Sequence, residues 1–495
     1  MGSRLASFIL STSILIQFTF VSGCASFFGG GVPNDPVDRL RYDIDRVFAD
    51  SIFRSTVPSL KVVAPGTGEV LYEANSEMFI RPASNMKILT SMTALHVLGP
   101  RYLFKTSLSW ESLFDDETVN GNVYLKGYGN PDLRTADLDT LAAQLAAIGV
   151  KRIAGNVVVD DSFFDSLQWG PGWMWDDEPA PYQAYVSALS VNKNCINVTV
   201  AYDSATGGVT VTTDPTTSYV TVRNFATVAT DSVTARLRIN RPATEPPNTI
   251  VVAGQILAGD EPREDQLTVL WPELYAGTLM MEALGRQGIS VDGVVERGRL
   301  PREVSEKAWH VWGIDSVIVN LNKVSDNLSA EMALKTISAT LNSPPGSVAS
   351  GRWGVNEYFA SLGIDSARHR MADGSGLSHY SLLRVGLIVD LLRAVYDDPE
   401  IFPLFYQSLP VAGVDGTLEE RMRGTRAQGN VRAKTGTISG VSSLSGYATT
   451  RDGEMLVFGM TMQDFIGSSV PYRRAQNRVC EILAIFSRSQ PHVSR

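Results

Sequence analysis

Cysteine is scarce in this chain, which has three cysteines among its 495 residues. Cys195 and Cys480 lie far apart in the sequence and lack the close pairing that is typical of zinc sites. Because there is no disulfide framework, the hydrophobic core must provide the stability. We expect both residues to be buried as small hydrophobic side chains, with a disulfide between them as the alternative in an oxidising compartment.

Histidine is scarce as well, with five residues in the whole chain. They are spread along the sequence without clustering: His96, His310, His369, His379 and His492. This pattern argues against a Ser-His-Asp triad and against a zinc site. The sequence also lacks a glycine-rich phosphate-binding loop. We therefore expect neither a metal ion nor a cofactor.

Positive charge is in deficit, with 43 Lys and Arg against 52 Asp and Glu, a net charge of -9 and a pI of about 5.2. This balance argues against nucleic acid as a partner. After the first 22 residues, no stretch is long and apolar enough to span a bilayer. The length and the 44% hydrophobic content are typical of a globular protein with two or three domains.

The N-terminus resembles a bacterial lipoprotein signal. Residues 5–22 are uncharged and mostly apolar, and small residues then lead into Cys24. We expect residues 1–24 to be the signal and lipobox, and residues 25–35 to be a tether. The exported protein would then be held at the periplasmic face of a membrane by acyl chains on Cys24. The alternative is a plain secretory signal that is cut near Ala25.

Three short strings lie in the order used by serine enzymes that open D-Ala-D-Ala peptides and β-lactam rings: SNMK at 84–87, SDN at 325–327 and KTGT at 434–437. Ser84 would be the nucleophile. Lys87 follows three residues later, so on a helix the two side chains share one face. This places an amine beside a hydroxyl that needs a base to become nucleophilic.

Each string alone is weak evidence, because short patterns arise by chance. A second S-x-x-K occurs at 190–193. The copy at Ser84 opens a helical pattern of apolar residues that Gly99 ends, whereas the residues after Ser190 are rich in Thr and Val and indicate a loop and a strand. Both copies precede the other two strings, so the helical context is what favours Ser84, and its combination with those strings supports the interpretation.

Longer segments extend the pattern. DGSGLS at 373–378, VAGVDGTL at 411–418 and GNVRAKTGT at 429–437 resemble class C penicillin-binding proteins, the D-alanyl-D-alanine carboxypeptidase/endopeptidase family of serine peptidases. The resemblance covers most of residues 36–490. Serine β-lactamases have a short gap between the first two motifs, whereas here these motifs are far apart, as in this family.

The resemblance implies an acyl-enzyme mechanism with three catalytic residues. Ser84 attacks the substrate carbonyl, Lys87 accepts its proton, and Ser325 relays a proton to the leaving amine. The backbone N–H groups of Ser84 and Thr437 would form the oxyanion hole. Lys87 must be neutral, and we expect burial together with Lys434 to lower its pKa. The expected substrate-binding residues are Asn327, Lys434, Thr435, Gly436, Thr437 and, from the inserted region, Asp160.

Several of these positions have simpler alternatives. The segment 373–378 is either a turn or a contact to substrate, and Ser325 and Asn327 would also be suitable caps for a helix near Leu328. His379 stands where the family often has an arginine that holds a carboxylate of the substrate's side chain. We take His379 as a surface histidine and leave the preferred diamino acid open.

The expected fold class is mixed α/β and multi-domain. A split penicillin-binding/β-lactamase-like transpeptidase domain takes residues 36–102 and 308–490. The inserted region, 103–307, contains a β-rich subdomain at 198–257, where Thr and Val alternate with Gly and Pro breaks. Periodicity predicts helices at 275–284, 328–341, 354–362, 382–395 and 473–486, and strands at 60–64, 70–74 and 455–462.

The sequence thus predicts a serine D-alanyl-D-alanine carboxypeptidase and D,D-endopeptidase that acts on peptidoglycan peptides and is acylated by β-lactams. One alternative is a serine β-lactamase or esterase of the same fold, against which the long insertion argues. Another is a non-catalytic wall-binding lipoprotein. The intact Ser84, Lys87 and Ser325 argue against that reading.

Overall fold

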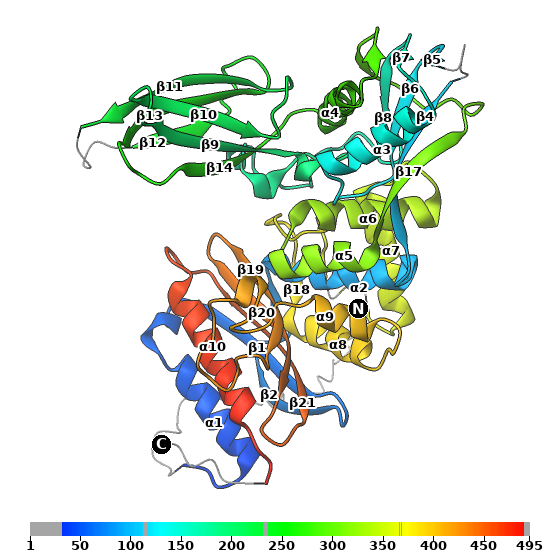
Figure 1. Ribbon diagram of the computed structural model, residues 1–495. Helices are drawn as coiled ribbons and strands as arrows, with labels where there is room; N and C mark the ends of the chain where they lie inside the picture. Colours follow the sequence, from blue (N-terminus) through cyan, green and yellow to red (C-terminus); the bar gives the residue numbers. More distant parts are fainter. Residues whose placement is uncertain (1–31, 112–116, 231–235, 366, 368, 490–495) are drawn as a thin grey trace, which may run out of the picture.

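The computed structural model describes residues 32–111, 117–230, 236–365, 367 and 369–489. The expected signal at 1–24, the lipidation site Cys24 and most of the tether lie outside these residues. Within the described part of the chain, no helix is long and apolar enough to cross a membrane. Figure 1 shows a lower part built from both ends of the chain and an upper part built from its middle.

A five-stranded antiparallel sheet forms the base of the lower part. Its order is β19 (Arg432–Ile438), β20 (Val441–Thr449), β21 (Met455–Gln463), β1 (Val57–Ala64) and β2 (Glu69–Ala74). The pairing of β1 with β21 joins segments from opposite ends of the sequence. One face of the sheet packs against α1 (Pro36–Phe48) and α10 (Val470–Ile485) in a shared apolar core. Because strands from both sides of the insertion form this sheet, it can be completed only after the C-terminal strands have been synthesised.

Helices cover the other face of this sheet and form the largest core. They are α2 (Met86–Leu98), α5 (Ile314–Val319), α6 (Asn327–Asn342), α7 (Val348–Ser361), α8 (Val385–Tyr396) and α9 (Phe402–Ser408). Helix α2 is the central one, and every residue from Met86 to Leu95 is buried. A helix that is buried on all sides is apolar all round, as this one is apart from a few hydroxyls and Lys87. Gly99, with a φ of 83°, ends it.

The upper part is inserted between α2 and α5. Its main sheet has the order β16 (Val295–Arg297), β8 (Val157–Asp160), β6 (Val123–Gly127), β4 (Leu103–Trp110) and β17 (Glu306–Gly313). Helices α3 (Thr135–Ala147) and α4 (Pro272–Arg286) pack on it in one core. A small sheet at its edge joins β5 (Thr118–Val119), β7 (Arg152–Ile153) and β15 (Ser290–Val291). Because β4 follows α2 and β17 precedes α5, this antiparallel pair is the stem of the insertion.

Two three-stranded sheets make up the β-rich projection at the upper left of Figure 1. One contains β9 (Cys195–Asp203), β10 (Gly208–Asp214) and β14 (Arg263–Thr268), and the other contains β11 (Thr221–Ala229), β12 (Leu237–Asn240) and β13 (Thr249–Leu257). The strands therefore occupy residues 195–268, somewhat more than the predicted 198–257. Val198 and Ile250 share a core with α4, so the projection packs directly on the rest of the insertion.

Short elements complete the chain around the catalytic motifs. The strands β3 (Phe79–Ile80) and β18 (Leu383–Arg384) pair with each other. A π-helical turn occupies Asn320–Val324, and 3-10 turns occupy Ser51–Phe53, Ala83–Asn85, Trp175–Asp177, Pro181–Gln183, Asn192–Asn194 and Gly416–Leu418. Cys195 and Cys480 are both buried and free, in separate apolar clusters. Their expected role as small hydrophobic side chains is confirmed, and the alternative of a disulfide between them does not hold.

Candidate active site

Ser84 lies on the 3-10 turn that leads into α2, and Lys87 lies in the first turn of that helix. The Lys87 Nζ donates to Ser84 Oγ over 3.0 Å, which is the contact that the sequence spacing predicts. Ser84 is half-buried, whereas Lys87 is fully buried. The neighbouring Asn85 donates to the carbonyl of Lys434 over 3.0 Å, so the turn is fixed to strand β19. Ser84 thus sits on a turn that is bonded to the sheet.

Lys87 contacts the first motif, the second motif and the segment 373–378. Besides Ser84, its Nζ donates to the Ser375 carbonyl over 2.8 Å and to Asn327 Oδ1 over 2.5 Å. Ser375 belongs to the segment 373–378, which therefore contacts Lys87, and Gly376 and Leu377 of the same segment line the larger of two hollows at Ser84; its contact to substrate stays a prediction. These three acceptors fix the direction of the amine toward Ser84.

The surroundings of Lys87 lower its pKa and so favour the neutral amine, which can act as a base. Burial lowers the pKa of Lys87 to about 8, although the carboxylates of Asp373, Glu331 and Asp326 act in the opposite direction. Burial, and then the charge of Lys87, hold the pKa of Lys434 well below its usual value. The charge repulsion between the two amines therefore lowers the pKa of Lys434, whereas we expected it to lower the pKa of Lys87. An amine with a pKa near 8 is partly neutral near pH 7, as a general base must be.

The second motif stands where the π-helical turn meets α6. Ser325 has a φ of 65°, which is unusual for a residue other than glycine. Its Oγ accepts a hydrogen bond from Lys434 Nζ over 2.8 Å. The cap of α6 is Asp326, whose side chain accepts from the N–H of Leu328. The capping alternative for Ser325 and Asn327 is therefore wrong, because Asp326 caps the helix. The side chains of Ser325 and Asn327 instead bond to Lys434 and Lys87 and line the cleft.

The third motif lies on the edge strand β19. A Cβ at Gly436 would lie 2.2 Å from Ser443 Oγ, 2.9 Å from the carbonyl of Pro82 and 3.0 Å from the N atom of Ser84. The fold itself therefore requires a glycine at this position, because only a residue without a Cβ lets β19 pack this closely against the turn that carries Ser84. The expected approach of a substrate backbone to Gly436 is an additional demand on the same position.

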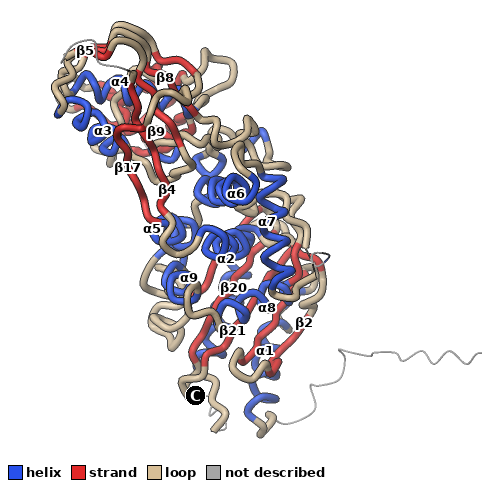
Figure 2. Tube along the Cα trace, turned by 90° about the vertical axis from the view of Figure 1, so that its right-hand side faces the viewer, coloured by secondary structure: helices blue, strands red, loops and turns tan. Residues whose placement is uncertain are grey.

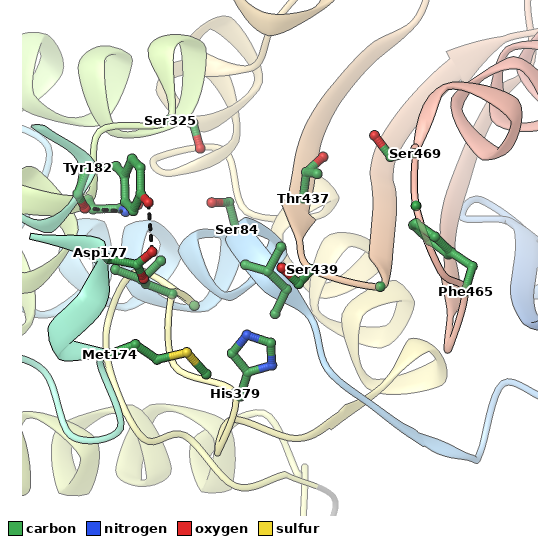
Figure 3. Close-up of a pocket in the computed structure, with 16 residues that line it drawn as sticks. Ser84, Met174, Asp177, Tyr182, Ser325, His379, Thr437, Ser439, Phe465 and Ser469 are labelled. Atoms are coloured by element: carbon green, nitrogen blue, oxygen red, sulfur yellow. Dashed lines mark hydrogen bonds between the residues drawn. The ribbon is translucent and has the colours of Figure 1, made fainter. Parts of the chain in front are cut away.

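Two adjoining hollows meet at the nucleophile (Figure 3). One has a volume of about 560 Å³ and the other about 390 Å³, and Ser84, Ser325 and Thr437 line both. In Figure 3 these three hydroxyl-bearing side chains converge on one space from three different elements. The larger hollow is further lined by Met174, Asp177, Tyr182, Asn327, Gly376, Leu377, His379, Ile438, Ser439, Gly440, Phe465, Gly467 and Ser469. The smaller is further lined by Thr417, Arg421, Thr435, Gly436 and Arg473.

Asp160, the residue expected from the inserted region, is not among the side chains that line either hollow. It is buried at the end of β8, where it accepts from the N–H groups of Ser162 and Leu300 and pairs with Lys126 over 3.2 Å. Its carboxylate is therefore committed inside the insertion. The inserted region instead contributes Asp177, whose Oδ1 accepts from the Tyr182 hydroxyl over 2.8 Å.

His379 lines the larger hollow. It is half-buried, and burial together with the nearby Arg81 lowers its pKa, so it is mainly neutral at neutral pH. Our interpretation of it as a surface histidine therefore understates its position, which is the one where the family's arginine is expected. In Figure 3 its ring stands across the hollow from Ser325 and Tyr182.

Glu331 is the buried site residue that sequence reasoning missed. It lies on α6, one turn after Asn327, and accepts the N–H groups of Gly374 and Ser375 over 3.0 and 2.8 Å. Burial and Asp373 raise the pKa of Glu331 to about 7. A glutamate between the apolar residues Leu328, Ala330, Met332 and Ala333 of the predicted helix was the available signal. It holds the backbone whose carbonyl, that of Ser375, contacts Lys87.

Comparison with known proteins agrees with this geometry. The D-Ala-D-Ala carboxypeptidase 3 (S13) family profile matches residues 40–483. A D-alanyl-D-alanine carboxypeptidase from Actinomadura sp. (strain R39) is 37% identical over 433 residues, which is 84% of this chain and 79% of that protein. The chain belongs to the S13 family. The predicted family and enzyme class, a serine-type D-Ala-D-Ala carboxypeptidase, are therefore confirmed.

Solved structures show the same fold for this S13 chain. The crystal structure of penicillin-binding protein 4 (dacB) from Haemophilus influenzae has a TM-score of 0.78 at 24% identity and covers 90% of this chain and 99% of its own. The same protein in complex with a novel β-lactam has a TM-score of 0.73 at 22% identity, with 90% and 100% covered. The predicted penicillin-binding fold with a mixed α/β architecture is confirmed.

Proposed function

We propose that this S13 enzyme hydrolyses the D-Ala-D-Ala bond of peptidoglycan stem peptides through an acyl-enzyme on Ser84. The hydrogen bond from Lys87 Nζ to Ser84 Oγ, at 3.0 Å in the floor of the double hollow, supports this most directly. Burial of Lys87 provides a base, and the hollow gives the carbonyl access to the serine. A base bonded to an accessible serine hydroxyl is the arrangement that activates a serine as a nucleophile for acyl transfer.

In the proposed reaction, Ser84 Oγ attacks the carbonyl carbon of the penultimate D-alanine while Lys87 takes the hydroxyl proton. The N–H groups of Ser84 and Thr437 stabilise the oxyanion, a contribution of about 3 kcal/mol for each such donor. The C–N bond then breaks, and the proton that Lys87 took passes to the leaving amine through Ser325, whose hydroxyl is bonded to Lys434, so that Lys87 is neutral again. A water molecule, deprotonated by Lys87, finally hydrolyses the ester and restores Ser84.

The smaller hollow suits the carboxylate end of the substrate. Arg421 and Arg473 line it beside Thr435 and Thr437, and neither arginine forms an ion pair with a residue that the structure describes. The guanidinium of Arg421 bonds only neutral oxygens, those of Asn477, Gln476 and the Arg473 carbonyl. Two cations without an acidic partner attract an anion to this side of Ser84. Lys434, which we expected to bind the carboxylate itself, is fully buried against Ser325.

The same hollow supports endopeptidase activity as well. Thr417 and Arg473 at its outer side are exposed, so a leaving group larger than one D-alanine has an open path to solvent. We propose that the enzyme also cuts D,D cross-links between stem peptides. Incubation with purified cross-linked muropeptide dimers, followed by mass spectrometry, tests this proposal, because an endopeptidase yields monomers and a strict carboxypeptidase releases only D-alanine.

The larger hollow receives the acyl side of the substrate, which carries the diamino acid. Its titratable side chains are Asp177 and His379, and the histidine is mainly neutral because burial and the nearby Arg81 lower its pKa. We propose that Asp177 attracts an ammonium group of the diamino acid, while the histidine gives no fixed positive charge for a carboxylate there. On this reading, the enzyme accepts lysine-type and diaminopimelate-type peptides with similar efficiency.

We also propose that the protein is exported and anchored by lipid on Cys24 at the periplasmic face of a membrane. The apolar residues 5–22 and the small residues before the cysteine support this, as does a substrate that lies outside the cytoplasm. Cys24→Ala in the full chain should release the protein from the membrane fraction. Unchanged sedimentation of that variant with membranes would contradict the proposal.

Incubation of the purified full chain with benzylpenicillin, followed by intact-mass spectrometry and peptide mapping, tests the central proposal. We expect a long-lived penicilloyl adduct on Ser84 and none on Ser84→Ala. Rapid hydrolysis of the drug without an adduct would favour the β-lactamase alternative. An intact drug and an unmodified protein would favour the non-catalytic alternative. Release of D-alanine from a D-Ala-D-Ala peptide by the same preparation completes the test.

A further inference from the structure

The second S-x-x-K string, Ser190 to Lys193, is not a second serine–lysine pair in the structure. Ser190 is buried and bonds within its own loop, to the Ser187 carbonyl and to Asn194. Lys193 does not bond to Ser190, and its side chain extends out of the inserted region toward the catalytic half. Its Nζ pairs with Asp132 of the insertion and with Asp326, the middle residue of the second motif, the latter over 2.5 Å.

The backbone that presents Lys193 is in a rare conformation. Asn192, Lys193 and Asn194 have φ values of 50°, 58° and 55°, three left-handed residues in a row without a glycine. Each such residue costs roughly 1–2 kcal/mol, and such strain persists only where the surroundings hold it in place. The amides of the two asparagines do so, since Asn192 bonds to Thr135 and Asn194 bonds to the Tyr185 carbonyl. A left-handed turn is thus maintained that aims Lys193 at Asp326.

The contacts of Asp326 connect this lysine to the cleft. Asp326 accepts from the N–H of Leu328 and from the Ser329 hydroxyl, so it fixes the start of α6. Lys193 also contacts the Ser329 hydroxyl, at 3.1 Å. Ser325, directly before this aspartate, has its own left-handed φ of 65°. Movement of Asp326 would therefore displace both neighbours in the motif, the hydroxyl that Lys434 contacts and the amide that Lys87 contacts.

The insertion holds the other end of the same lysine. Asp132 is almost fully buried, with 4% of its surface exposed, and its second oxygen accepts from Asn320 Nδ2 over 2.9 Å. Asn320 begins the π-helical turn that leads into Ser325, and its carbonyl accepts from the N–H of Asp326. Contacts among Asp132, Lys193, Asp326 and Asn320 thus form a closed ring that joins the inserted region to the second motif.

We infer that Lys193 is a positioning residue for the reaction: its ammonium, held between Asp132 of the insertion and Asp326 of the second motif, fixes Ser325 and Asn327 toward Ser84. The inference rests on the proposed function of Ser84. It assigns the inserted region a direct part in forming the cleft, because the catalytic half alone leaves Asp326 without this cation.

Lys193 also bears on the charge of the catalytic lysine. The groups that face Lys87 are Asp373, Glu331, Asp326 and, as a like charge, Lys434. The cation of Lys193 offsets the negative charge of Asp326. Its removal would leave that carboxylate free to stabilise protonated Lys87, so the acylation rate would rise only at a higher pH.

The test compares variants of the purified full chain by their second-order rate constant for acylation by benzylpenicillin across pH, and by kcat and KM for a D-Ala-D-Ala peptide. Lys193→Met removes the cation, Lys193→Arg keeps it, and Lys151→Met is the matched control. Lys151 belongs to the same insertion, and its ion pair with Glu117 is exposed. Asp132→Asn removes the ion pair of Lys193 with Asp132 and keeps the one with Asp326. It serves as a second variant if Lys193→Met does not fold.

We expect Lys193→Met to lower acylation and kcat by about 100-fold, the effect of a misplacement near 1 Å, and to move the rising limb of the pH profile to higher pH. Lys193→Arg should recover most of the rate, and Lys151→Met should equal the wild type. Asp132→Asn should lose rate without the alkaline shift, because Asp326 keeps its cation.

A Lys193→Met protein that reacts as the wild type would overturn the inference, as would an equal loss in Lys193→Met and Lys193→Arg with an unshifted profile. Should Lys193→Met fail to fold, a wild-type rate in Asp132→Asn would overturn it too. A wild-type protein that is not acylated at Ser84 at all would instead contradict the proposed function, so the two failures are distinguishable.

Discussion

The Nζ of Lys434 donates a hydrogen bond to the Ser325 hydroxyl over 2.8 Å, which joins the third motif to the second across the cleft. The two residues come from β19 and from the junction before α6; Ser325 lines both hollows at Ser84, and Lys434 is buried behind it. This bond orients the Ser325 hydroxyl, which in the proposed mechanism passes the proton from Lys87 to the leaving amine. The proposed protonation of the leaving amine therefore needs no histidine. This agrees with the scattered histidines of the sequence, which argue against a Ser-His-Asp triad.

Replacement of Lys434 by methionine should break this relay while filling nearly the same buried volume. We expect acylation by benzylpenicillin and release of D-alanine to fall by roughly 100-fold or more, the usual contribution of a positioned acid or base. Lys61→Met, on β1 of the same sheet, is the control, because its ion pairs with Glu73 and Asp390 are long, at 4.0 and 3.8 Å. Stopped-flow or mass-spectrometric acylation kinetics check this, and a Lys434→Met rate equal to the control would refute it.

The pH profile of acylation should follow the protonation of Lys87. Only the neutral amine can accept the Ser84 proton, so the rate should rise with pH through the pKa of about 8 and level off above it. Glu331→Gln removes a negative charge that favours protonated Lys87, so we expect the rise at a lower pH. Glu357→Gln, at an exposed position on α7, should leave the profile unchanged. An unshifted or alkaline-shifted profile in Glu331→Gln would contradict this account of the site.

Much of this site could be predicted from the sequence because short strings carry it. A serine and a lysine three residues apart on a helix must share a face, so Ser84 and Lys87 needed no knowledge of the fold. The order of the three strings then fixed the family. The helices and strands of the catalytic half follow from apolar periodicity, since they pack on one large core.

The residues that the sequence did not reveal are those placed by long-range packing. Asp160 follows an apolar strand just as a site residue would, but the fold turns its carboxylate into the insertion. Asp177 reaches the cleft from an irregular loop that has no periodicity to read. Lys193 looked like a chance match, and only the fold shows that it meets Asp326, more than a hundred residues away in sequence.

Gly436→Ala should separate the nucleophile from β19. The added Cβ would meet Ser443 Oγ, which is itself bonded to the Pro82 carbonyl over 2.8 Å, and the backbone on either side of Ala83. Relief of the clash requires a shift of the turn that carries Ser84. We expect the acylation rate to fall by about 100-fold, whereas folding, followed by thermal melting, changes less. Gly285→Ala on α4 meets open space and should gain stability, by about 1 kcal/mol at most, without a change in rate. A normal rate in Gly436→Ala would show that the strand has room to move.

His379→Arg should change which peptides the enzyme prefers. The substitution places a permanent positive charge in the larger hollow, opposite Asp177, where the native histidine is mainly neutral. A charge-assisted hydrogen bond contributes about 1.5–3 kcal/mol, so the ratio of kcat/KM for a diaminopimelate peptide over a lysine peptide should rise by roughly tenfold or more. His379→Gln, which is neutral and of similar size, should leave that ratio near the wild-type value. Release of D-alanine from the two peptides at one pH measures it. An unchanged ratio in His379→Arg would mean that the diamino acid side chain lies elsewhere, since a new cation within its reach must discriminate between an ammonium alone and an ammonium with a carboxylate.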